Sequence, residues 1–120
     1  MDATARIGAG VRWEEPIALG PHAVLGKDVR IGRNALIAAY CYLIGGDHDF
    51  SDAARPVLEQ ARKSAGITVG DGAWLGAGAK VLDGVEIGAN AVVGAGAVVR
   101  ESVPERATAV GVPARVVGAR

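Results

Sequence analysis

An apolar residue recurs every six positions along this chain, on both sides of a single interruption. Before the interruption the series runs through Ile7, Trp13, Leu19, Leu25, Ile31, Ile37 and Leu43. After the interruption it runs through Val69, Leu75, Val81, Ile87, Val93 and Val99. A period of six matches neither the 3.6-residue period of an α-helix nor the two-residue period of a plain strand. It is typical of a repeat made of one short strand and one turn, which predicts an all-β chain wound into a parallel β-helix of hexapeptide repeats.

Two other positions of the six-residue unit also follow a pattern. A small or medium-sized residue stands four positions after nearly every apolar one, and a glycine often follows the apolar residue directly, as Gly70 follows Val69. Three units per turn of the helix would place residues 18 apart over one another, at the spacing of about 4.8 Å between paired strands. The expected columns are Ile7 with Leu25 and Leu43, Val69 with Ile87, and Leu75 with Val93. The glycines are expected at tight corners, where φ is positive and a Cβ atom would clash.

The repeat is absent between Gly45 and Gly66, and it resumes two places out of phase. We therefore expect a loop over about 46–66 that is extruded from one corner of the helix and contains a helical turn within Leu58–Lys63. Loops of this length are uncommon in compact domains and are often functional. The expected organisation is a single domain over 1–120, with coils over 7–45 and 67–104 and a tail over 105–120 that caps one open end.

Composition agrees with a narrow, stacked core and excludes several classes of function. Aromatic residues make up only 4% of the chain and glycine contributes 18 residues, so the core must be built from small aliphatic side chains. Thirteen acidic and 13 basic residues cancel, which does not indicate a nucleic-acid or anionic-membrane partner. No apolar run approaches the roughly 18 residues of a membrane span. The start lacks a signal-peptide layout and one cysteine excludes internal disulfides, so a cytoplasmic location is expected.

Three segments accompany the repeat: Gly46-Asp-His-Asp-Phe-Ser-Asp52, Gly72-Ala-Trp-Leu-Gly-Ala-Gly-Ala79 and Ala109-Val-Gly-Val-Pro-Ala-Arg-Val-Val117. Over roughly residues 25–117 the chain resembles the hexapeptide-repeat O-acetyltransferases, most of all the branch with the maltose, galactoside and surface-polysaccharide enzymes. The resemblance implies a left-handed β-helix, a homotrimer, and acetyl-CoA bound in grooves between subunits. It also implies transfer of an acetyl group to a small-molecule hydroxyl, with a saccharide as the expected acceptor, and no metal.

His48 in the extruded loop matches the general base of this family. A hydroxyl is a poor nucleophile until its proton is removed, and an imidazole with a pKa of about 6.5 suits that task at neutral pH. Asp47 or Asp49 could orient the ring. From the residues alone, the favoured interpretation of His48 is a polar loop residue on the surface. His22 matches no motif of the family and is expected to be solvated.

Trp74 precedes the inward-facing Leu75, so strand alternation predicts that the indole points outward. The resemblance places this tryptophan beside the pantetheine arm of the donor, and an interface role is the alternative. It also assigns the amide of Ala77 to the developing oxyanion, a role that any residue with an N–H can fill. Ala95, one coil further along, is expected to contact the CoA arm.

Arg100 and Arg115 are the expected partners of the CoA phosphates, because a guanidinium matches phosphate oxygens in shape and charge. Arg115 corresponds directly to a position of the family. The chain departs from the family at Arg100-Glu101, where relatives commonly carry Thr-Lys, and Glu101 would repel a phosphate. Arg106 and Arg120 are expected to be solvated.

The loop residues Asp49, Phe50 and Arg55 lie where the family's loop meets its acceptor, and they are the expected acceptor-binding residues. Cys41 falls at an inward position of the repeat and is expected to be plain core. The identity of the acceptor is not encoded in these residue types.

Three alternatives stay open. A serine acetyltransferase shares the Gly-Ala-Gly-Ala-Lys segment at 76–80, but its Asp-Arg-His-Pro segment is missing here. A γ-type carbonic anhydrase needs three histidines for zinc, and the chain has two. A trimeric scaffold without catalysis is the non-enzymatic reading.

Overall fold

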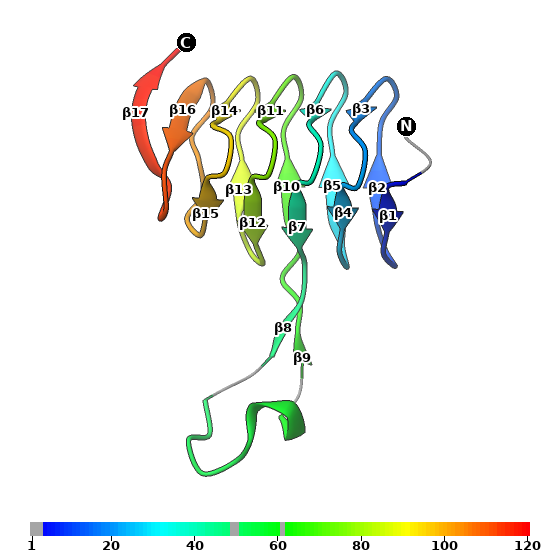
Figure 1. Ribbon diagram of the computed structural model, residues 1–120, viewed down its shortest axis with the longest axis vertical. Coiled ribbons are helices and arrows are strands. Elements are labelled where there is room, and N and C mark those ends of the chain that lie inside the picture. The colour runs from blue at the N-terminus through cyan, green and yellow to red at the C-terminus, as the bar shows by residue number, and fades with distance from the viewer. Residues whose placement is uncertain (1–3, 49–50, 61) are drawn as a thin grey trace.

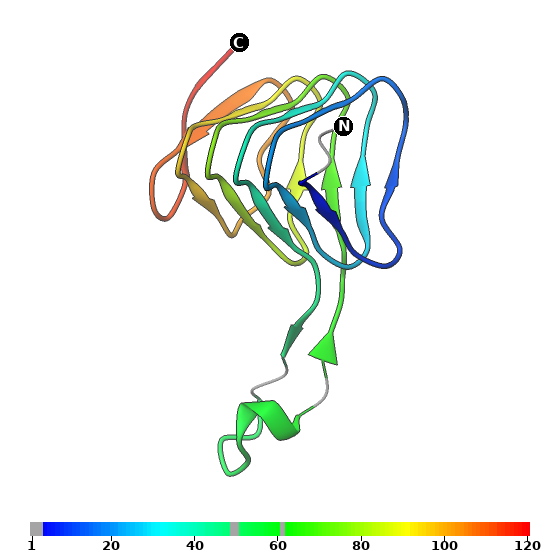
Figure 2. The same ribbon diagram turned by 45° about the vertical axis from the view of Figure 1, so that its right-hand side comes forward.

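The chain winds into a three-sided prism from which one long arm projects (Figures 1 and 2). The computed structural model describes residues 4–48, 51–60 and 62–120. Sheet A contains β1 (Arg6–Ile7), β4 (Val24–Leu25), β7 (Tyr42–Ile44), β12 (Lys80–Leu82) and β15 (Val98–Val99). Sheet B contains β2 (Arg12–Trp13), β5 (Val29–Ile31), β10 (Ile67–Val69) and β13 (Glu86–Ile87). Sheet C contains β3 (Ala18–Leu19), β6 (Leu36–Ile37), β11 (Trp74–Leu75), β14 (Val92–Val93), β16 (Ala107–Val110) and β17 (Arg115–Ala119).

The predicted fold class, an all-β left-handed parallel β-helix with an extruded loop and a C-terminal cap, is confirmed. Successive coils pair in parallel, and Ile7 stands opposite Leu25, which stands opposite Leu43, as the 18-residue spacing predicts. Val69 pairs with Ile87 and Leu75 with Val93, again as predicted. No helix within the described ranges is long and apolar enough to cross a membrane.

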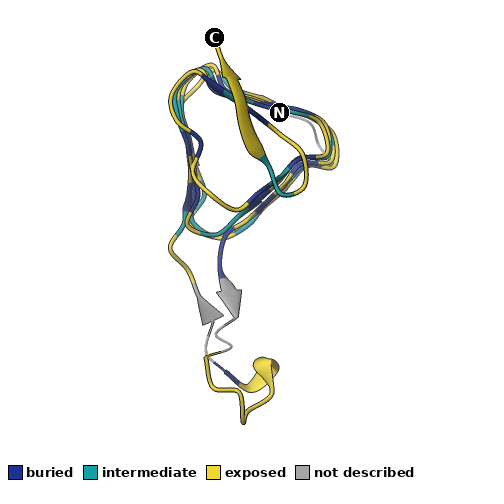
Figure 3. Ribbon diagram, turned by 90° about the vertical axis from the view of Figure 1, so that its left-hand side faces the viewer, coloured by how far each residue is buried: buried dark blue, intermediate teal, exposed yellow. Residues whose placement is uncertain are grey.

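The interior of the prism is filled by two inward-facing side chains from each six-residue unit. A small residue and an aliphatic residue two positions later, such as Ala73 and Leu75, are both fully buried. Figure 3, viewed along the prism, shows that buried residues occur on all three sides. Cys41 belongs to the core as expected: its Sγ donates a hydrogen bond to the Gly76 carbonyl at 3.2 Å, and burial raises the pKa of the thiol.

The arm, residues 46–66, replaces a single corner between sheets A and B. Across it, partners such as Ile31 and Val69 are 38 residues apart instead of 18, so the insertion adds 20 residues to one coil. The shaft of the arm is a short antiparallel pair, β8 (Asp47–His48) with β9 (Arg62–Lys63). The tip carries a 3-10 helix, η1 (Val57–Glu59), so the helical turn expected within Leu58–Lys63 lies earlier and is shorter. Pro56 precedes that turn, a position at which proline is tolerated because its missing N–H would have no partner inside the helix.

The C-terminal end of the prism is closed by a change of direction. The last coil is two residues shorter than the others, since Ile87 bridges to Val103, 16 residues further on. Strand β17 then turns back and pairs antiparallel with β16. This strand covers the open edge of sheet C, which would otherwise present unpaired backbone groups.

The glycines that follow the apolar residues are needed for a reason that the sequence pattern only half predicts. An added Cβ at Gly70 would lie 2.5 Å from the Ala89 nitrogen, and one at Gly88 would lie 2.4 Å from the Glu105 nitrogen. Clash with the next coil is therefore confirmed. The expectation of positive φ at these glycines is wrong. Positive φ falls two positions later, at residues that include Gly10, His22, Asp28, Asn34, Tyr40, Gly72, Gly78, Gly84, Asn90 and Gly96.

Gly70→Ala should lower the free energy of unfolding by about 1–3 kcal/mol, because a Cβ there forces two coils apart. Gly118→Ala is the matched control, since nothing lies within 4 Å of a Cβ at that position. Thermal unfolding monitored by circular dichroism measures both. Equal unfolding midpoints for the two variants would show that the coils can separate without loss.

Candidate functional site

Sheet C presents an apolar stripe on its outer surface. Leu36, Trp74 and Val92 stand side by side on β6, β11 and β14. The side chain of Trp74 is 50% exposed and that of Leu36 is 42% exposed, so the predicted outward direction of Trp74 is confirmed. An indole left this open is a surface for a ligand or for another protein.

The corner that leads from sheet C to sheet A, called the C–A corner, brings Ala77 and Ala95 one above the other. The Gly96 N–H donates to the Ala77 carbonyl at 2.9 Å, and the Gly78 N–H donates to the Ala39 carbonyl at 2.9 Å. Ala77 and Ala95 are exposed, and among the described residues no acceptor meets either amide N–H. The same is true of Ala39, so open amides are a property of this turn. The corner is a ladder of N–H donors with a step of about one coil spacing, 4.8 Å.

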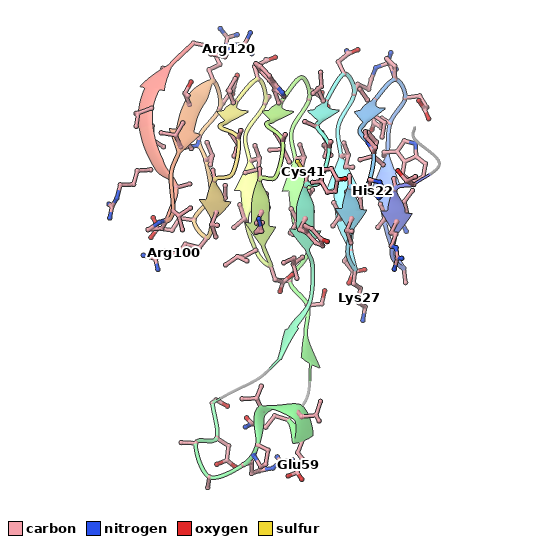
Figure 4. The ribbon with its side chains drawn as sticks, in the orientation of Figure 1. His22, Lys27, Cys41, Glu59, Arg100 and Arg120 are labelled. Carbon is pink, nitrogen blue, oxygen red and sulfur yellow. The ribbon has the colours of Figure 1, made fainter. Side chains whose placement is uncertain are left out.

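Arg100 and Arg115, which are distant from the arm, are brought into one pocket at the C-terminal end of the prism. The pocket has a volume of about 220 Å³. Its lining consists of Arg100, Glu101, Ser102, Val103, Ala109, Pro113, Ala114, Arg115 and Val116. Figure 4 shows Arg100 at this end, far from His22. Two guanidinium groups suit the phosphate oxygens of a nucleotide, and the Glu101 carboxylate in the same lining opposes them.

The arm carries the remaining predicted residues. The backbone of His48 lies on β8, opposite Arg62 on β9, in the shaft of the arm. Only the backbone of Asp47 and His48 is described, and Asp49 and Phe50 lie outside the described residues. The structure therefore places the base of the predicted chemistry on the arm without placing its ring.

Arg55, the third predicted acceptor residue, helps to close the tip of the arm. Its Nη2 donates to the Glu59 carbonyl at 2.8 Å. The side chain of Gln60 is only 7% exposed, and its Nε2 donates to the carbonyls of Asp52 and Arg55, both at 2.9 Å. These hydrogen bonds hold the tip together, and the described contacts give Arg55 a structural role there.

Asp83 holds the root of the arm and was not among the residues expected from the sequence. Its Oδ1 accepts hydrogen bonds from the N–H of Gly46 at 3.0 Å and of Gly66 at 2.9 Å. Its Oδ2 accepts one from the N–H of Ala65 at 2.8 Å. The outgoing and returning strands of the arm are thus tied to one carboxylate on the next coil. A signal was present: Asp83 occupies the A–B corner one coil above the interruption.

The ionisation of Asp83 reflects this clamp. Burial by itself raises the pKa of the carboxyl, but the surrounding N–H donors outweigh burial and hold the pKa below its ordinary value of 3.8. A carboxyl with a lowered pKa adds stability above its ordinary pKa and loses it as the pH falls through the folded value. The clamp is therefore intact at neutral pH and weakens only below pH 3.8.

One chain does not bring all the predicted residues together. The arm leaves the corner between sheets A and B, and in a three-sided prism that corner lies opposite sheet C (Figures 1 and 3). Trp74 on sheet C and the arm with His48 thus lie on opposite sides of the prism. Within the part of the chain that the structure describes, no three His, Cys, Asp or Glu side chains are placed to hold a metal.

Comparison with known proteins adds a family and a set of relatives. The sequence profile of the bacterial transferase hexapeptide family (six repeats) matches residues 66–101. The Mycobacterium tuberculosis (strain H37Rv) protein named Probable acetyltransferase Rv3034c is 35% identical over 109 residues. The match covers 89% of this chain and 36% of that protein, so the chain spans about a third of the length of this curated relative.

Solved structures of the same fold include transferases that act on different groups. A maltose O-acetyltransferase from Clostridium difficile 630 is 25% identical, with a TM-score of 0.72, over 97% of this chain and 70% of that one. Soybean serine acetyltransferase is 36% identical, with a TM-score of 0.62, over 95% of this chain and 40% of that one. AntD, an N-acyltransferase from Bacillus cereus in complex with dTDP and 3-hydroxybutyryl-CoA, is 22% identical, with a TM-score of 0.87, over 99% of this chain and 68% of that one. At this identity the likeness shows the fold alone.

Asp83→Asn should loosen the arm at neutral pH, because the amide accepts fewer bonds and its NH₂ faces N–H donors. Loss of a charge-assisted hydrogen bond in such a clamp is worth about 1–3 kcal/mol. Amide hydrogen exchange at Gly46, Ala65 and Gly66 should accelerate about tenfold or more. The difference from wild type should shrink as the pH falls below 3.8.

Asp71→Asn is the control, because the Asp71 carboxylate accepts from the Arg33 N–H at 3.0 Å at a corner that carries no arm. Equal exchange rates in wild type and Asp83→Asn at pH 7 would show that the arm is held by other contacts.

Proposed function

We propose that this chain, which is similar to hexapeptide-repeat acetyltransferases, transfers an acetyl group from acetyl-CoA to a hydroxyl of a sugar or saccharide. The observation that carries this proposal is the surface around the C–A corner. There the exposed Trp74 stands beside the open amides of Ala77 and Ala95, and an arginine-lined pocket follows at the C-terminal end. We take residues 1–120 as a single catalytic domain, with a homotrimer as the working form.

The donor would lie along the prism axis. Arg100 and Arg115 would bind its phosphates in the pocket of about 220 Å³. The N–H of Ala95 and the indole of Trp74 would hold the pantetheine arm, which brings the thioester carbonyl to Ala77. Glu101 in the pocket lowers the net positive charge there, so the adenine end contributes less to affinity than two unopposed arginines would.

In the proposed reaction, the His48 imidazole takes the proton of the acceptor hydroxyl as its oxygen attacks the thioester carbonyl. The Ala77 N–H donates to the oxyanion of the tetrahedral intermediate. The carbon–sulfur bond then breaks, and the CoA thiolate leaves and takes up the proton from the imidazolium. The products are the acetyl ester and CoA, and His48 returns to its neutral form.

The opposite placement of the arm and Trp74 supports a site shared between copies. In a closed ring of three, each interface is head-to-tail, so the arm of one subunit can reach the C–A corner of the next. The exposed apolar side chains of Val57 and Leu58 at the arm tip and of Leu36 on sheet C are surfaces that such a ring would cover.

An amine acceptor is the second candidate, since a perosamine N-acetyltransferase from Caulobacter crescentus is 30% identical, with a TM-score of 0.63, over 98% of this chain and 52% of that one. A neutral amine is already a nucleophile, whereas a hydroxyl requires a base, and the chain offers His48 for that role. Similarity to a maltose O-acetyltransferase over 97% of the chain supports the hydroxyl, and similarity to a serine acetyltransferase keeps an amino-acid hydroxyl as a further candidate.

His48→Ala should retain the fold and lose at least about a hundredfold in rate, the usual scale for a general base. Trp74→Ala should also lower the rate of acetyl transfer. Random trimers assembled from equal amounts of the two variants should regain activity at about a quarter of their sites, if each site takes its arm and its tryptophan from different subunits.

Steady-state acetyl transfer, followed by release of free CoA thiol, measures all three samples. Glu59→Ala on the same arm is the control for the loss of a surface side chain. Wild-type turnover by His48→Ala would overturn the proposed base, and inactive mixtures would overturn the shared site.

CoA should raise the thermal unfolding midpoint, because a ligand that binds only the folded state adds about 4 kcal/mol at a thousand times its Kd. Arg115→Ala should reduce that shift, whereas Arg33→Ala, an exposed arginine on another corner, should not. Differential scanning fluorimetry with and without CoA makes the comparison. An unchanged midpoint for wild type would favour the non-catalytic scaffold.

A further inference from the structure

A second, larger cavity opens beside the C–A corner near the N-terminal end of the prism. Its volume is about 480 Å³. Its lining consists of Thr4, Arg6, His22, Val24, Tyr40 and Tyr42. In a chain with only 4% aromatic residues, both tyrosines and a histidine border this one hollow. None of these residues has a role in the proposed chemistry.

The rings of His22 and Tyr40 form a platform. They occupy equivalent places on successive coils, and their centroids lie 5.0 Å apart with 21° between the planes. The side chain of Tyr40 is 58% exposed and that of Tyr42, on the adjoining strand, is 42% exposed. A stacked pair that remains this open presents a flat apolar surface to solvent.

The backbone under the platform is strained. His22 has φ of 58° and Tyr40 has φ of 61°. At the same turn position, the later coils of this corner carry Gly78 and Gly96, which adopt positive φ without penalty. Aromatic residues in the left-handed region are uncommon, and such strain is concentrated at binding and active sites.

The position of the platform relative to the proposed acyl-transfer point is specific. Tyr40 follows Ala39, whose carbonyl accepts the Gly78 N–H, so Tyr40 lies one coil below Ala77 and His22 lies two coils below. At about 4.8 Å per coil, the platform begins about 5 Å from the Ala77 amide and ends about 10 Å from it. The arginine pocket lies at the other end of the axis. A donor that runs from this pocket to Ala77 leaves the N-terminal side as the approach for the acceptor.

We propose that the cavity of His22, Tyr40 and Tyr42 is the acceptor subsite and that it takes a hexopyranose ring. The inference rests on the proposed acetyl transfer at Ala77. The C–H face of the pyranose stacks on Tyr40, while the Arg6 guanidinium and the Tyr42 hydroxyl donate hydrogen bonds to ring hydroxyls. Among the described residues, Arg6 is the only charged side chain in the lining, which suits an uncharged or singly acidic sugar better than a nucleoside diphosphate.

Tyr40→Gly and His22→Gly test the platform, because glycine removes the ring and accepts the positive φ. Asn34→Gly is the matched control: Asn34 has φ of 62° at the equivalent turn position of another corner and is not in the cavity. All three variants should remain folded, which circular dichroism and thermal unfolding check.

Binding is measured by saturation-transfer NMR with the methyl pyranosides of glucose, galactose, mannose and N-acetylglucosamine. The binding measurements use protein that also carries His48→Ala, so that sugar binding is observed without acetyl-CoA and without turnover. At least one glycoside should receive saturation from the protein, and Tyr40→Gly should weaken that binding about tenfold, the scale of one lost ring contact. Asn34→Gly should bind as the parent does.

Kinetics with the best glycoside give the second readout. Tyr40→Gly should raise the KM for the glycoside about tenfold and leave the KM for acetyl-CoA unchanged. Binding by none of the four glycosides, equal binding by Tyr40→Gly, or a signal from uridine but from no glycoside would overturn the subsite. Sugar binding that depends on Tyr40 would support it even if His48→Ala remained active, so the two proposals can fail separately.

Discussion

The fold depends on backbone hydrogen bonds that join each coil to the next at the spacing of paired strands. The Gly70 N–H donates to the Ile87 carbonyl at 2.7 Å, and the Gly76 N–H donates to the Val93 carbonyl at 2.8 Å. This close approach leaves no room for a Cβ at those glycines. It also limits the interior to one small and one medium side chain per strand, which accounts for the scarcity of large residues in the core. Because each coil repeats the same geometry, side chains and amides at equivalent positions line up in columns. Those columns provide the stripe of sheet C and the ladder of donors at the C–A corner.

The arm shows how a repetitive structure accommodates an insertion. Twenty residues leave at one corner, yet Ile31 still pairs with Val69 and Leu43 with Val81, so the ladder closes on both sides. The entropic cost of such a loop grows slowly with its length, and the clamp at its root limits the freedom that remains. Asp83 supplies that clamp by binding both strands of the root, and it does so with a carboxylate that stays ionised well below neutral pH. A base carried on this arm is thereby delivered in a defined direction, away from its own sheet C.

The proposed chemistry divides between two subunits for a geometric reason. The arm leaves the corner between sheets A and B, whereas Trp74 lies on sheet C, on the opposite side of the prism. In the proposed ring of subunits this separation would be resolved, with the donor along the C-terminal half of the C–A corner and the acceptor on the aromatic platform of the N-terminal half. The order along the axis, from the arginine pocket through Ala95 and Ala77 to Tyr40 and His22, follows directly from the stacking of coils.

The six-residue period of the sequence by itself determined much of the structure of this protein. It predicted the columns of Ile7, Leu25 and Leu43, the outward Trp74 and the extruded arm, because a hydrogen-bonded coil must repeat its inward positions. It predicted a Cβ clash at the glycines but assigned the clash to a tight corner with positive φ, since a local turn rule does not contain the close approach between successive coils. The 18-residue spacing could have predicted that His22 and Tyr40 lie on successive coils. It could not predict that their rings stack, because stacking depends on the turn conformation at each corner. Only the tertiary structure decided the rest. Asp83 meets the arm, and Arg115 joins Arg100 in the lining of one pocket, only after the chain has turned back on itself. Such neighbours depend on the path of the backbone rather than on its period.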